Sequence, residues 1–438
     1  MKRLLLLYFV LTYMNVLADE FTIGGLSFTS LSDKEVKIKK SKNQDIEFLD
    51  IPQYVSYNGK KYKVTSIGIG VFGEHRRIKE AKIPNGIKVI EQMAFMNCDS
   101  LKSIFIPKSV TNIEKMAFSN QNIENIIIDT NNPIYDSRNN CNAIIETKSN
   151  TLLLGCKNTI IPDGVVKISD AFHCNISTIN IPKSVTSINK DAFKMCWFIE
   201  KITVDKDNPI FDSRNNCNAI IETRANILIH GCQNTMIPNS VKNIGDYAFE
   251  SCLFLHKLYI PNGVKEVGDY AFINCNNIKV ISLPKTLTRI GKNAFSGISI
   301  LDSIYVDAGN PIYDSRGNCN ALIETKTNKL LIGTENTIIP NSVVSVADMA
   351  FGTVMPKTPK AREEIIIPES VIVIGNRAFF FCENLVKVTC KRKTPPIVGL
   401  NIFHPYSLRH GTLHVPKGSI EAYRKDPFWG KFSTIIEE

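Results

Sequence analysis

The sequence predicts a mainly β solenoid, and three observations support this fold class. A pattern recurs with a period of 23 residues, as in the steps from Ile83 to Ile106, Ile237 to Ile260 and Ile260 to Leu283. Each copy has alternating apolar residues before a proline, and each carries an Ala-Phe pair. One copy is too short to bury both of its sides, so stacked copies must form the core together.

The strand of each repeat is clearest in the stretch LKSIFIP, which begins at Leu101. Ile104 and Ile106 alternate with Phe105, which is the two-residue period of a strand with one buried face. Pro107 has no backbone N–H to donate to a neighbouring strand and therefore ends the strand. In stacked copies we expect these strands to pair into a parallel sheet along the solenoid.

A turn follows each strand and returns the chain to the core. In the same repeat we expect Val110 and Ile113 to point inward after the turn KSVT. Ala117 and Phe118 then supply a small residue and a large core plug, which we expect on a short helical turn.

Three repeats are longer than the others. The stretch NPIYDSRNNCNAIIET begins at Asn132 and recurs in closely similar form from Asn208 and Asn310. The expected proline before it is replaced by Asp, and the distance to the next Ile-Pro pair grows from 23 to 33 residues. The stretch that begins NAIIET has two apolar runs around a polar turn, which predicts a β-hairpin. We therefore predict hairpin insertions near residues 129–160, 205–236 and 307–338.

The inserted motif contains the residue types of an active site, but the pattern favours a structural role. No copy of this sixteen-residue stretch contains a histidine, so Ser137 and Cys141 have no evident base to activate them. Asp136 and Ser137 are typical turn residues that bond nearby backbone amides. Asn139 suits backbone with positive φ. We predict no catalytic residue in these motifs.

The first eighteen residues predict an export signal. Lys2 and Arg3 precede an apolar run, and Val16 and Ala18 match the small-x-small pattern of a cleavage site. The run is shorter than the roughly 20 residues that span a bilayer. Cleavage after Ala18 lowers the formal net charge from +10 to +8. From the export signal we expect a chain that is secreted, periplasmic or on the cell surface. Because its lysines are scattered among acids and not clustered, we expect no nucleic-acid partner.

The pattern I-P-x-S-V-x-x-I-x-x-x-A-F-x-x-C-x-x-L resembles the BspA-type leucine-rich repeat of bacterial surface proteins. The stretch IPQYVSYNGKKYKVTSIG is similar to that family's N-terminal β cap, and the segment from TPPIVGLNIF to the end is similar to its closing module. The resemblance implies a β cap at 19–64, repeats at 65–390 and a C-terminal cap at 391–438. It also implies a curved solenoid with its strands on the concave face, and a role in binding or adhesion.

The twelve cysteines allow two interpretations. Six of them share one repeat position after the Ala-Phe pair, where Gln121 and Ile298 stand in other repeats; this favours small buried side chains: Cys98, Cys174, Cys196, Cys252, Cys275 and Cys382. Disulfides Cys141–Cys156 and Cys217–Cys232 could instead bridge the first two hairpins. The third hairpin has Cys319 but Thr334 at the partner position, so the pairing stays open.

Two further patterns suggest cofactor or metal chemistry only at first sight. GIGVFG at Gly68–Gly73 fits a dinucleotide signal, but its apolar residues fall on repeat positions and no βαβ unit surrounds it. His404, His410 and His414 lie close in sequence without a carboxylate or cysteine nearby to complete a ligand set. We predict neither a cofactor nor a metal site.

The outward residues of the strands form the candidate binding surface. If each Ile-x-Ile pair faces the core, the residue between and the residue two positions earlier face outward. The resulting candidates are Phe105, Ile127, Lys201, Thr203, Lys257, Tyr259, Ser282 and Tyr305.

These observations favour a non-enzymatic repeat protein that binds a macromolecular partner, a protein or a glycan, through its concave face. One alternative is a carbohydrate-binding accessory protein of glycan uptake, and another is a structural surface component without a specific ligand. The ligand and the oligomeric state stay open.

Overall fold

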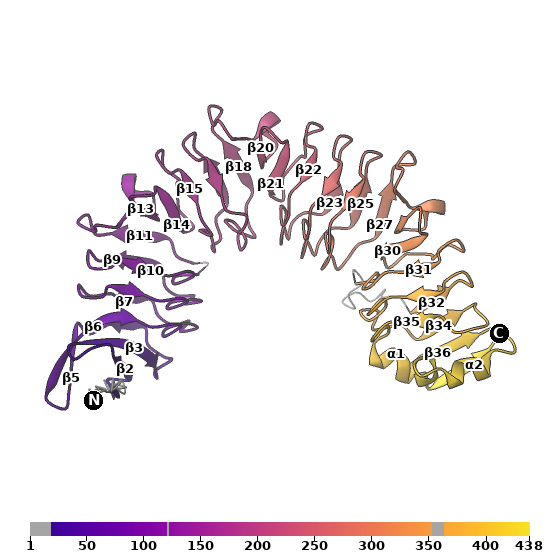
Figure 1. Cartoon of the computed structure of the whole chain (residues 1–438), viewed down its shortest axis with the longest axis horizontal. Helices are drawn as coiled ribbons and strands as arrows, with labels where there is room; N and C mark the ends of the chain where they lie inside the picture. The colour runs from indigo at the N-terminus through magenta and orange to yellow at the C-terminus, as the bar shows by residue number, and fades with distance from the viewer. Residues whose placement is uncertain (1–18, 121, 353–362) are drawn as a thin grey trace, which may run out of the picture. The chain divides into compact units, whose positions relative to one another are not determined.

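The computed structural model describes residues 19–120, 122–352 and 363–438, so the predicted export signal at residues 1–18 and the repeat position of Gln121 lie outside it. The chain forms two compact units. The first contains the chain up to Lys148 together with Leu154–Asn158, and the second contains Ser149–Leu153 and Thr159–Glu438. Each is built of stacked coils, labelled in Figure 1.

The first unit begins with an antiparallel β-structure. Strands β1, β2 and β3 pair in sequence order, β5 pairs antiparallel with β6, and β6 also pairs in parallel with β3. Their bounds are β1 Glu20–Ile23, β2 Leu26–Ser30, β3 Glu35–Ser41, β5 Tyr54–Tyr57 and β6 Lys60–Ile67. Strand β6 continues in parallel to a two-residue strand of the first repeat, β8 (Val89–Ile90). The N-terminal segment thus supplies a paired edge for the repeats, while the boundary at residue 64 stays a prediction.

Most coils contain two strands on different sides of the core. We call the strand before the Ile-Pro position the long strand and the one after the turn the short strand. The long strands are β4 Phe48–Asp50, β7 Glu80–Lys82, β9 Ser103–Ile106, β11 Asn125–Ile128, β16 Thr178–Ile181, β18 Lys201–Val204, β23 Lys257–Tyr259, β25 Val280–Leu283, β27 Ser303–Val306, β32 Glu364–Ile367 and β34 Lys387–Cys390. The short strands are β8, β10 Asn112–Ile113, β15 Lys167–Ile168, β17 Ser187–Ile188, β22 Asn243–Ile244, β24 Glu266–Val267, β26 Arg289–Ile290, β31 Ser345–Val346, β33 Val373–Ile374 and β35 Ile397–Val398.

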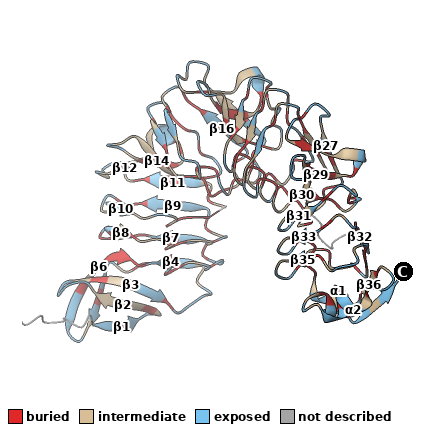
Figure 2. Cartoon of the chain, turned by 45° about the vertical axis from the view of Figure 1, so that its right-hand side comes forward, coloured by how far each residue is buried: buried red, intermediate tan, exposed pale blue. Residues whose placement is uncertain are grey.

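The long strands alternate as predicted. In β9 and β11, Ile104, Ile106, Ile126 and Ile128 are buried while the residues between them are exposed. Figure 2 shows buried and exposed residues following each other along the coils. The outward surface of these strands is called the long-strand face below.

The parallel sheet is present but is interrupted, which the sequence did not predict. The long strands pair in separate groups: β4 with β7, β9 with β11, β16 with β18, β23 with β25 and β27, and β32 with β34. The last of these groups continues to the C-terminal strands β36 (Thr412–Val415) and β37 (Thr434–Glu437). In three of the groups the last strand, β11, β18 or β27, leads directly into an insertion, so the insertions end these three groups.

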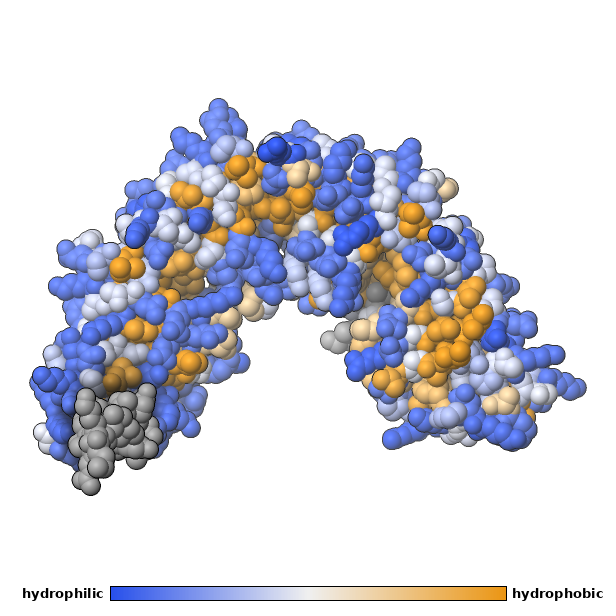
Figure 3. Space-filling view, viewed as in Figure 1, coloured by the Kyte–Doolittle hydropathy of each residue, from blue (hydrophilic) through white to orange (hydrophobic). Residues whose placement is uncertain are grey.

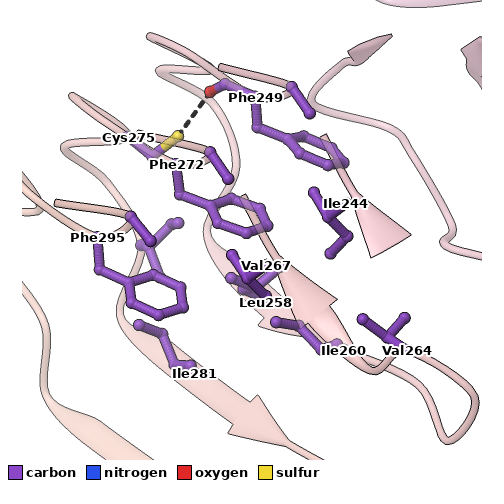
Figure 4. Close-up of a cluster of buried hydrophobic side chains, with 14 of the residues drawn as sticks. Ile244, Phe249, Leu258, Ile260, Val264, Val267, Phe272, Cys275, Ile281 and Phe295 are labelled. Atoms are coloured by element: carbon purple, nitrogen blue, oxygen red, sulfur yellow. Dashed lines mark hydrogen bonds between the residues drawn. The ribbon is translucent and has the colours of Figure 1, made fainter. Parts of the chain in front are cut away.

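Stacked phenylalanine rings hold successive coils together. Phe249 and Phe272 lie with ring centroids 4.9 Å apart, and Phe272 and Phe295 lie 5.5 Å apart, all nearly parallel (Figure 4). The backbone repeats with them, because Phe272 N donates to Ala294 O at 2.8 Å. Similar stacks join Phe72, Phe95 and Phe118 in the first unit and Phe351, Phe379 and Phe403 in the second. We call these stacks the phenylalanine ladders.

The Ala-Phe segment is a single hydrogen-bonded turn rather than a longer helix. In one coil Ala248 N donates to Gly245 O at 3.3 Å. The residue before the alanine has positive φ, with φ 57° at both Tyr247 and Tyr270. A left-handed residue cannot continue a right-handed helix, so the segment closes once and presents the phenylalanine ring to the core.

The C-terminal segment places helices next to the last parallel strands. Helix α1 is Pro405–His410, and α2 is Ile420–Lys425. Trp429 is fully buried, and its Nε1 donates to Pro396 O at 3.1 Å. The Tyr423 hydroxyl donates to Arg392 O at 2.8 Å. The segment therefore closes over the end of the core with bonded aromatic residues, while the boundary at residue 390 stays a prediction.

We predict that Phe272→Ala lowers the free energy of unfolding by about 3–5 kcal/mol, because it removes a fully buried ring from the middle of a ladder. Chemical denaturation followed by circular dichroism measures the change. The control Phe254→Ala removes an exposed ring and should cost less than about 1 kcal/mol. Equal losses for the two variants contradict a stabilising role of the ladder.

Candidate functional site

The repeated insertion forms the hairpins predicted from sequence. In the second copy, β19 (Phe211–Asp212), β20 (Ala219–Glu222) and β21 (Ile227–Gly231) pair antiparallel in order. The third copy repeats this with β28 (Tyr313–Asp314), β29 (Ala321–Glu324) and β30 (Lys329–Gly333). In the first copy, β12 (Tyr135–Asp136) pairs with β13 (Ala143–Glu146). Strands β21 and β30 then pair in parallel with the next short strands, so each hairpin starts a new short-strand sheet.

The Asp and Arg of the motif bind each other. In the third copy Arg316 Nε donates to Asp314 Oδ1 at 2.7 Å, and Thr325 Oγ1 donates to Asp314 Oδ2 at 2.9 Å. Burial alone raises the pKa of Asp314, but the hydrogen bonds from Arg316 and Thr325 outweigh it and leave the pKa below its usual value. Arg316 Nη1 also donates to Asn328 Oδ1 at 2.7 Å across the hairpin. This carboxylate therefore holds the hairpin and is not poised as a base.

The Ser and Asn of the motif bond to the edge of the interrupted long-strand sheet. Ser315 Oγ donates to Ile304 O on β27 at 3.1 Å. In the second copy Ile202 N on β18 donates to Asn218 Oδ1 at 3.4 Å. Asn218 holds φ 54°, as suits an asparagine. Side chains thus replace the backbone partners that the next strand would otherwise supply.

The first residues of the motif form hydrogen bonds with the turn and the short strand of the preceding coil. The buried Asn310 donates from Nδ2 to Pro284 O at 2.7 Å and to Leu287 O at 2.9 Å. The Tyr313 hydroxyl accepts from Ile290 N on β26 at 3.2 Å. The polar residues of the motif, which looked like an active site, are therefore structural.

The insertion also divides the core. Strand β29 is buried on both faces: Leu322 packs into the hydrophobic cluster before the insertion, whereas Ala321 and Ile323 pack into the cluster after it. The hairpin therefore lies between two hydrophobic cores and has no Ala-Phe pair of its own. This interrupts the phenylalanine ladder between Phe295 and Phe351.

Side chains of the second insertion fill the corresponding gap in the ladder. The ring of His230 packs against Phe193 with centroids 5.0 Å apart. Gly231 leaves room for Phe249, because a Cβ there would lie 2.2 Å from its Cε1. Burial lowers the pKa of His230 to about 4, and its Nε2 has no hydrogen-bond partner among the described residues.

The cysteines of the described chain are free and buried. Those at the shared repeat position include Cys275, whose Sγ donates to Phe249 O at 2.9 Å (Figure 4). Burial raises the pKa of Cys275 to about 12. In the second hairpin Cys232 Sγ donates to Glu200 O, and Thr334 Oγ1 donates to the equivalent Asp302 O at 3.3 Å in the third. Cys232 and Thr334 thus share a hydrogen-bonding role that needs no disulfide.

The three histidines near the C-terminus serve separate local roles. His404 Nδ1 accepts from Tyr406 N at 3.2 Å and caps α1. His410 packs against Tyr406, and His414 pairs with Glu438. Within the described ranges no group of three or more histidine, cysteine or acidic side chains is placed to hold a metal ion.

The eight predicted surface residues lie on the long-strand face, in three groups. Phe105 lies directly opposite Ile127 across β9 and β11. Lys201 and Thr203 lie on β18. The third group extends over neighbouring strands β23, β25 and β27 and contains Lys257, Tyr259, Ser282 and Tyr305.

Tyr259 and Tyr305 are not direct neighbours, because Ser282 lies between them in register. The two tyrosines are therefore two strand spacings apart, or roughly 10 Å. Both are more than half exposed, at 61% and 54%. The small serine leaves the space between the two rings open.

Three further apolar residues on this surface were not predicted from the sequence. Ile160, Met236 and Ile338 are 73%, 69% and 77% exposed. Each stands immediately before an Ile-Pro pair, as Phe105 and Tyr259 do, but directly after an insertion and outside a strand. Aligning the Ile-Pro pairs instead of the strands would have found them. Met236 and Tyr259 line one pocket together with Lys257 and Pro261.

The first insertion also borders a pocket beside the long-strand face. The pocket lies between β11 and the loop of the inserted motif and is lined by Ile127, Asp129, Asp136 and Arg138, among others. The hairpin therefore adds a polar wall next to one of the predicted surface residues.

The stacked coils of strands and turns form a mainly β solenoid of the leucine-rich-repeat class. The BspA type leucine rich repeat region matches residues 65–153, 144–222, 215–316 and 357–428, with six copies. The chain belongs to the BspA-type leucine-rich repeat family. This family consists of non-enzymatic repeat proteins and suggests an interaction or adhesion scaffold at the cell surface or outside the cell.

Several solved structures are similar to this chain. A leucine-rich cell surface protein from Faecalibacterium prausnitzii is 19% identical, with 96% of this chain and 95% of that chain covered and a TM-score of 0.38. A leucine-rich repeat protein from Bacteroides ovatus is 22% identical, with 95% and 99% covered and a TM-score of 0.36. The pneumococcal vaccine antigen PcpA is 15% identical, with 96% and 99% covered and a TM-score of 0.36. No curated protein sequence matches the chain. In the described part of the chain, no helix has the length and apolar character needed to cross a membrane.

We predict that His230→Leu changes how stability depends on pH. Because folding lowers the pKa of His230 from 6.5 to about 4, the unfolded chain binds more protons in this range. The contribution of the neutral His230 side chain to the stability of the wild type is fully present above pH 6.5 and is lost as the pH falls toward 4. Leucine, which occupies the equivalent position at Leu154, cannot titrate. Denaturation at pH 7 and pH 4 should show the variant gaining about 3 kcal/mol relative to the wild type at the lower pH. Parallel pH profiles contradict this.

Proposed function

We propose that this protein is an exported, non-enzymatic scaffold that binds a protein partner through its long-strand face. The observation that carries the proposal is a column of exposed apolar and aromatic side chains in the second unit: Met236, Tyr259, Tyr305, Ile338 and Ile366. All five occupy the position before the Ile-Pro pair or its equivalent, so they recur along one surface.

Cross-strand pairing accounts for some exposed apolar residues but not for this column. Phe105 and Ile127 lie opposite each other and stabilise their own two-stranded sheet. Tyr259 and Tyr305 have only Ser282 as an in-register neighbour on the strand between them, so their rings gain no aromatic partner across it. Exposed tyrosines on a rigid sheet are typical anchors of protein interfaces. The second unit therefore offers the stronger candidate surface.

The surface is also suited to an anchored contact. The pocket between Met236 and Tyr259 can accept an apolar side chain, with Lys257 at its edge to bind a carboxylate. Backbone hydrogen bonds fix β23, β25 and β27 relative to one another, so little ordering is needed on binding.

We predict that the double variant Tyr259→Ala, Tyr305→Ala binds at least about tenfold more weakly to intact bacterial or host-cell surfaces, as expected for the loss of two anchors. Labelled protein and flow cytometry measure the binding. Tyr406→Ala removes a similarly exposed tyrosine from α1 and is the matched control. Undiminished binding of the double variant removes the long-strand face from the proposal.

Treatment of the cells distinguishes the kinds of partner. Protease treatment should abolish wild-type binding, and a glycan array should give no signal that depends on Tyr259 and Tyr305. Binding that survives protease and appears on the array supports the carbohydrate alternative instead. Absence of binding to every surface supports a structural component without a ligand.

A further inference from the structure

The short strands of the second unit change character after the third insertion. Before it, the first residue of β22, β24 and β26 and the residue preceding each of these strands are polar or charged: Lys242, Asn243, Lys265, Glu266, Thr288 and Arg289. After it, the same positions on β31, β33 and β35 are mostly apolar: Val344, Ser345, Ile372, Val373, Pro396 and Ile397. The repeat does not require apolar residues there, since the earlier coils fold without them.

These side chains form one exposed surface, which we call the short-strand patch. It consists of Val344, Ile372, Val373, Ile397 and Leu400, all of which are exposed. Val373 lies opposite Ile397 in register, and Ile372 N donates to Val344 O at 2.8 Å, so the residues are contiguous. Figure 3 shows apolar surface gathered on the visible face near β31 and β35, in surroundings that are mainly hydrophilic.

Packing within the sheet does not account for the patch. Ile397 remains 68% exposed and Leu400 75% exposed, so their side chains gain little from their neighbours. A contiguous apolar surface of this kind on a solvent-exposed face indicates an interaction site.

A pocket at one end of the patch adds a specific anchor point. It lies between the loop from Ile397 to Leu400 and the segment that contains Phe428 and Lys431. The Phe428 ring forms part of its wall and packs on Phe403, with centroids 6.3 Å apart. The pocket is therefore supported from below by the last phenylalanine ladder.

The charges beside the patch indicate what it binds. Lys431 Nζ lies 5.7 Å from the centre of the Phe428 ring and makes no ion pair within the described chain. The backbone N of Arg377 donates to Leu400 O at 2.9 Å, and its guanidinium carbon lies 6.0 Å from the centre of the Phe380 ring, with no carboxylate partner among the described residues. The acid at the pocket, Asp426, accepts hydrogen bonds at Oδ1 from the backbone N–H groups of Phe428 and Trp429 at 2.8 and 2.9 Å. The two cations outnumber this one carboxylate.

We propose that the short-strand patch binds an acidic, apolar segment of a partner protein, with one large apolar side chain in the pocket and a carboxylate near Lys431 or Arg377. This site is independent of the long-strand face. A second copy of the chain fits less well, because a two-fold contact would place the cations of both patches in one interface. A membrane surface fits less well, since two cations contribute only about 1 kcal/mol each to binding anionic lipid.

Selection of peptides from a random dodecapeptide phage library on the immobilised full chain tests the proposal. We expect enrichment of peptides that place a large apolar residue beside Asp or Glu. A synthetic copy of the most enriched peptide, measured by fluorescence anisotropy, should bind about tenfold more weakly to the variant Ile397→Ser, Leu400→Ser. Lys431→Glu should weaken binding about fivefold and reduce its dependence on salt.

The matched control is Ile69→Ser, which removes a side chain of similar exposure, 65%, from a place outside both proposed surfaces and should leave peptide binding unchanged. Absence of enrichment, selection of peptides without acids, or equal binding to the patch variants overturns the proposal. Dimerisation or binding to phosphatidylglycerol vesicles that Ile397→Ser abolishes, without peptide binding, assigns the patch to another occupant and also overturns it. Loss of cell-surface binding by the tyrosine variants does not bear on this result, so the two proposals fail separately.

Discussion

The stacking of one buried phenylalanine on the next is the interaction on which the repeats depend. Each coil contributes a single turn, and the positive φ at positions such as Tyr270 aims the ring of Phe272 at its neighbours in adjacent coils. The carbonyl of the alanine before each phenylalanine accepts from the phenylalanine N–H of the preceding coil, as Ala294 O does from Phe272 N. Ring stacking and backbone bonding therefore recur together, even where the spacing differs from 23 residues, as between Phe351 and Phe379. The two strands of a coil follow from this constraint, because they lie on either side of the ladder.

The insertions matter because they interrupt that interaction. A hairpin without an Ala-Phe pair ends one ladder, and its central strand β29 is buried against the cores on both sides. The edge of the long-strand sheet then needs new partners, which Ser315 and its equivalents supply. The Asp314–Arg316 pair fixes the loop that carries them. The motif is rich in reactive residue types, but these side chains form the hydrogen bonds that hold the hairpin and the sheet edge. In addition, the exposed residues that follow each insertion, such as Met236 and Ile338, extend the long-strand face across the interruption.

Most features of a single coil were predictable from the sequence, because the spacing of apolar and turn residues in the repeat indicates its strands and turns. The alternation around Phe105, the burial of the Ala-Phe pair and the hairpin at Asn310 all follow from local periodicity and turn chemistry. The breaks in the sheet did not follow, because they depend on hydrogen bonds such as that from Ser315 to Ile304, between residues that no periodic pattern relates. Ile160, Met236 and Ile338 were missed because they follow irregular backbone where strand alternation gives no signal. The short-strand patch was missed for a different reason: Val344, Ile372 and Ile397 stand out only when compared with equivalent positions such as Lys242 and Lys265.

The central claim is that the third insertion separates two cores that are held by different phenylalanine ladders. Native-state hydrogen exchange across the second unit, measured at increasing denaturant, tests it most directly. Amides of β24, β25 and β26, before the insertion, should open as one group, and amides of β31, β33 and β34, after it, should open as another with a different free energy. A single opening free energy shared by all these strands would contradict the account.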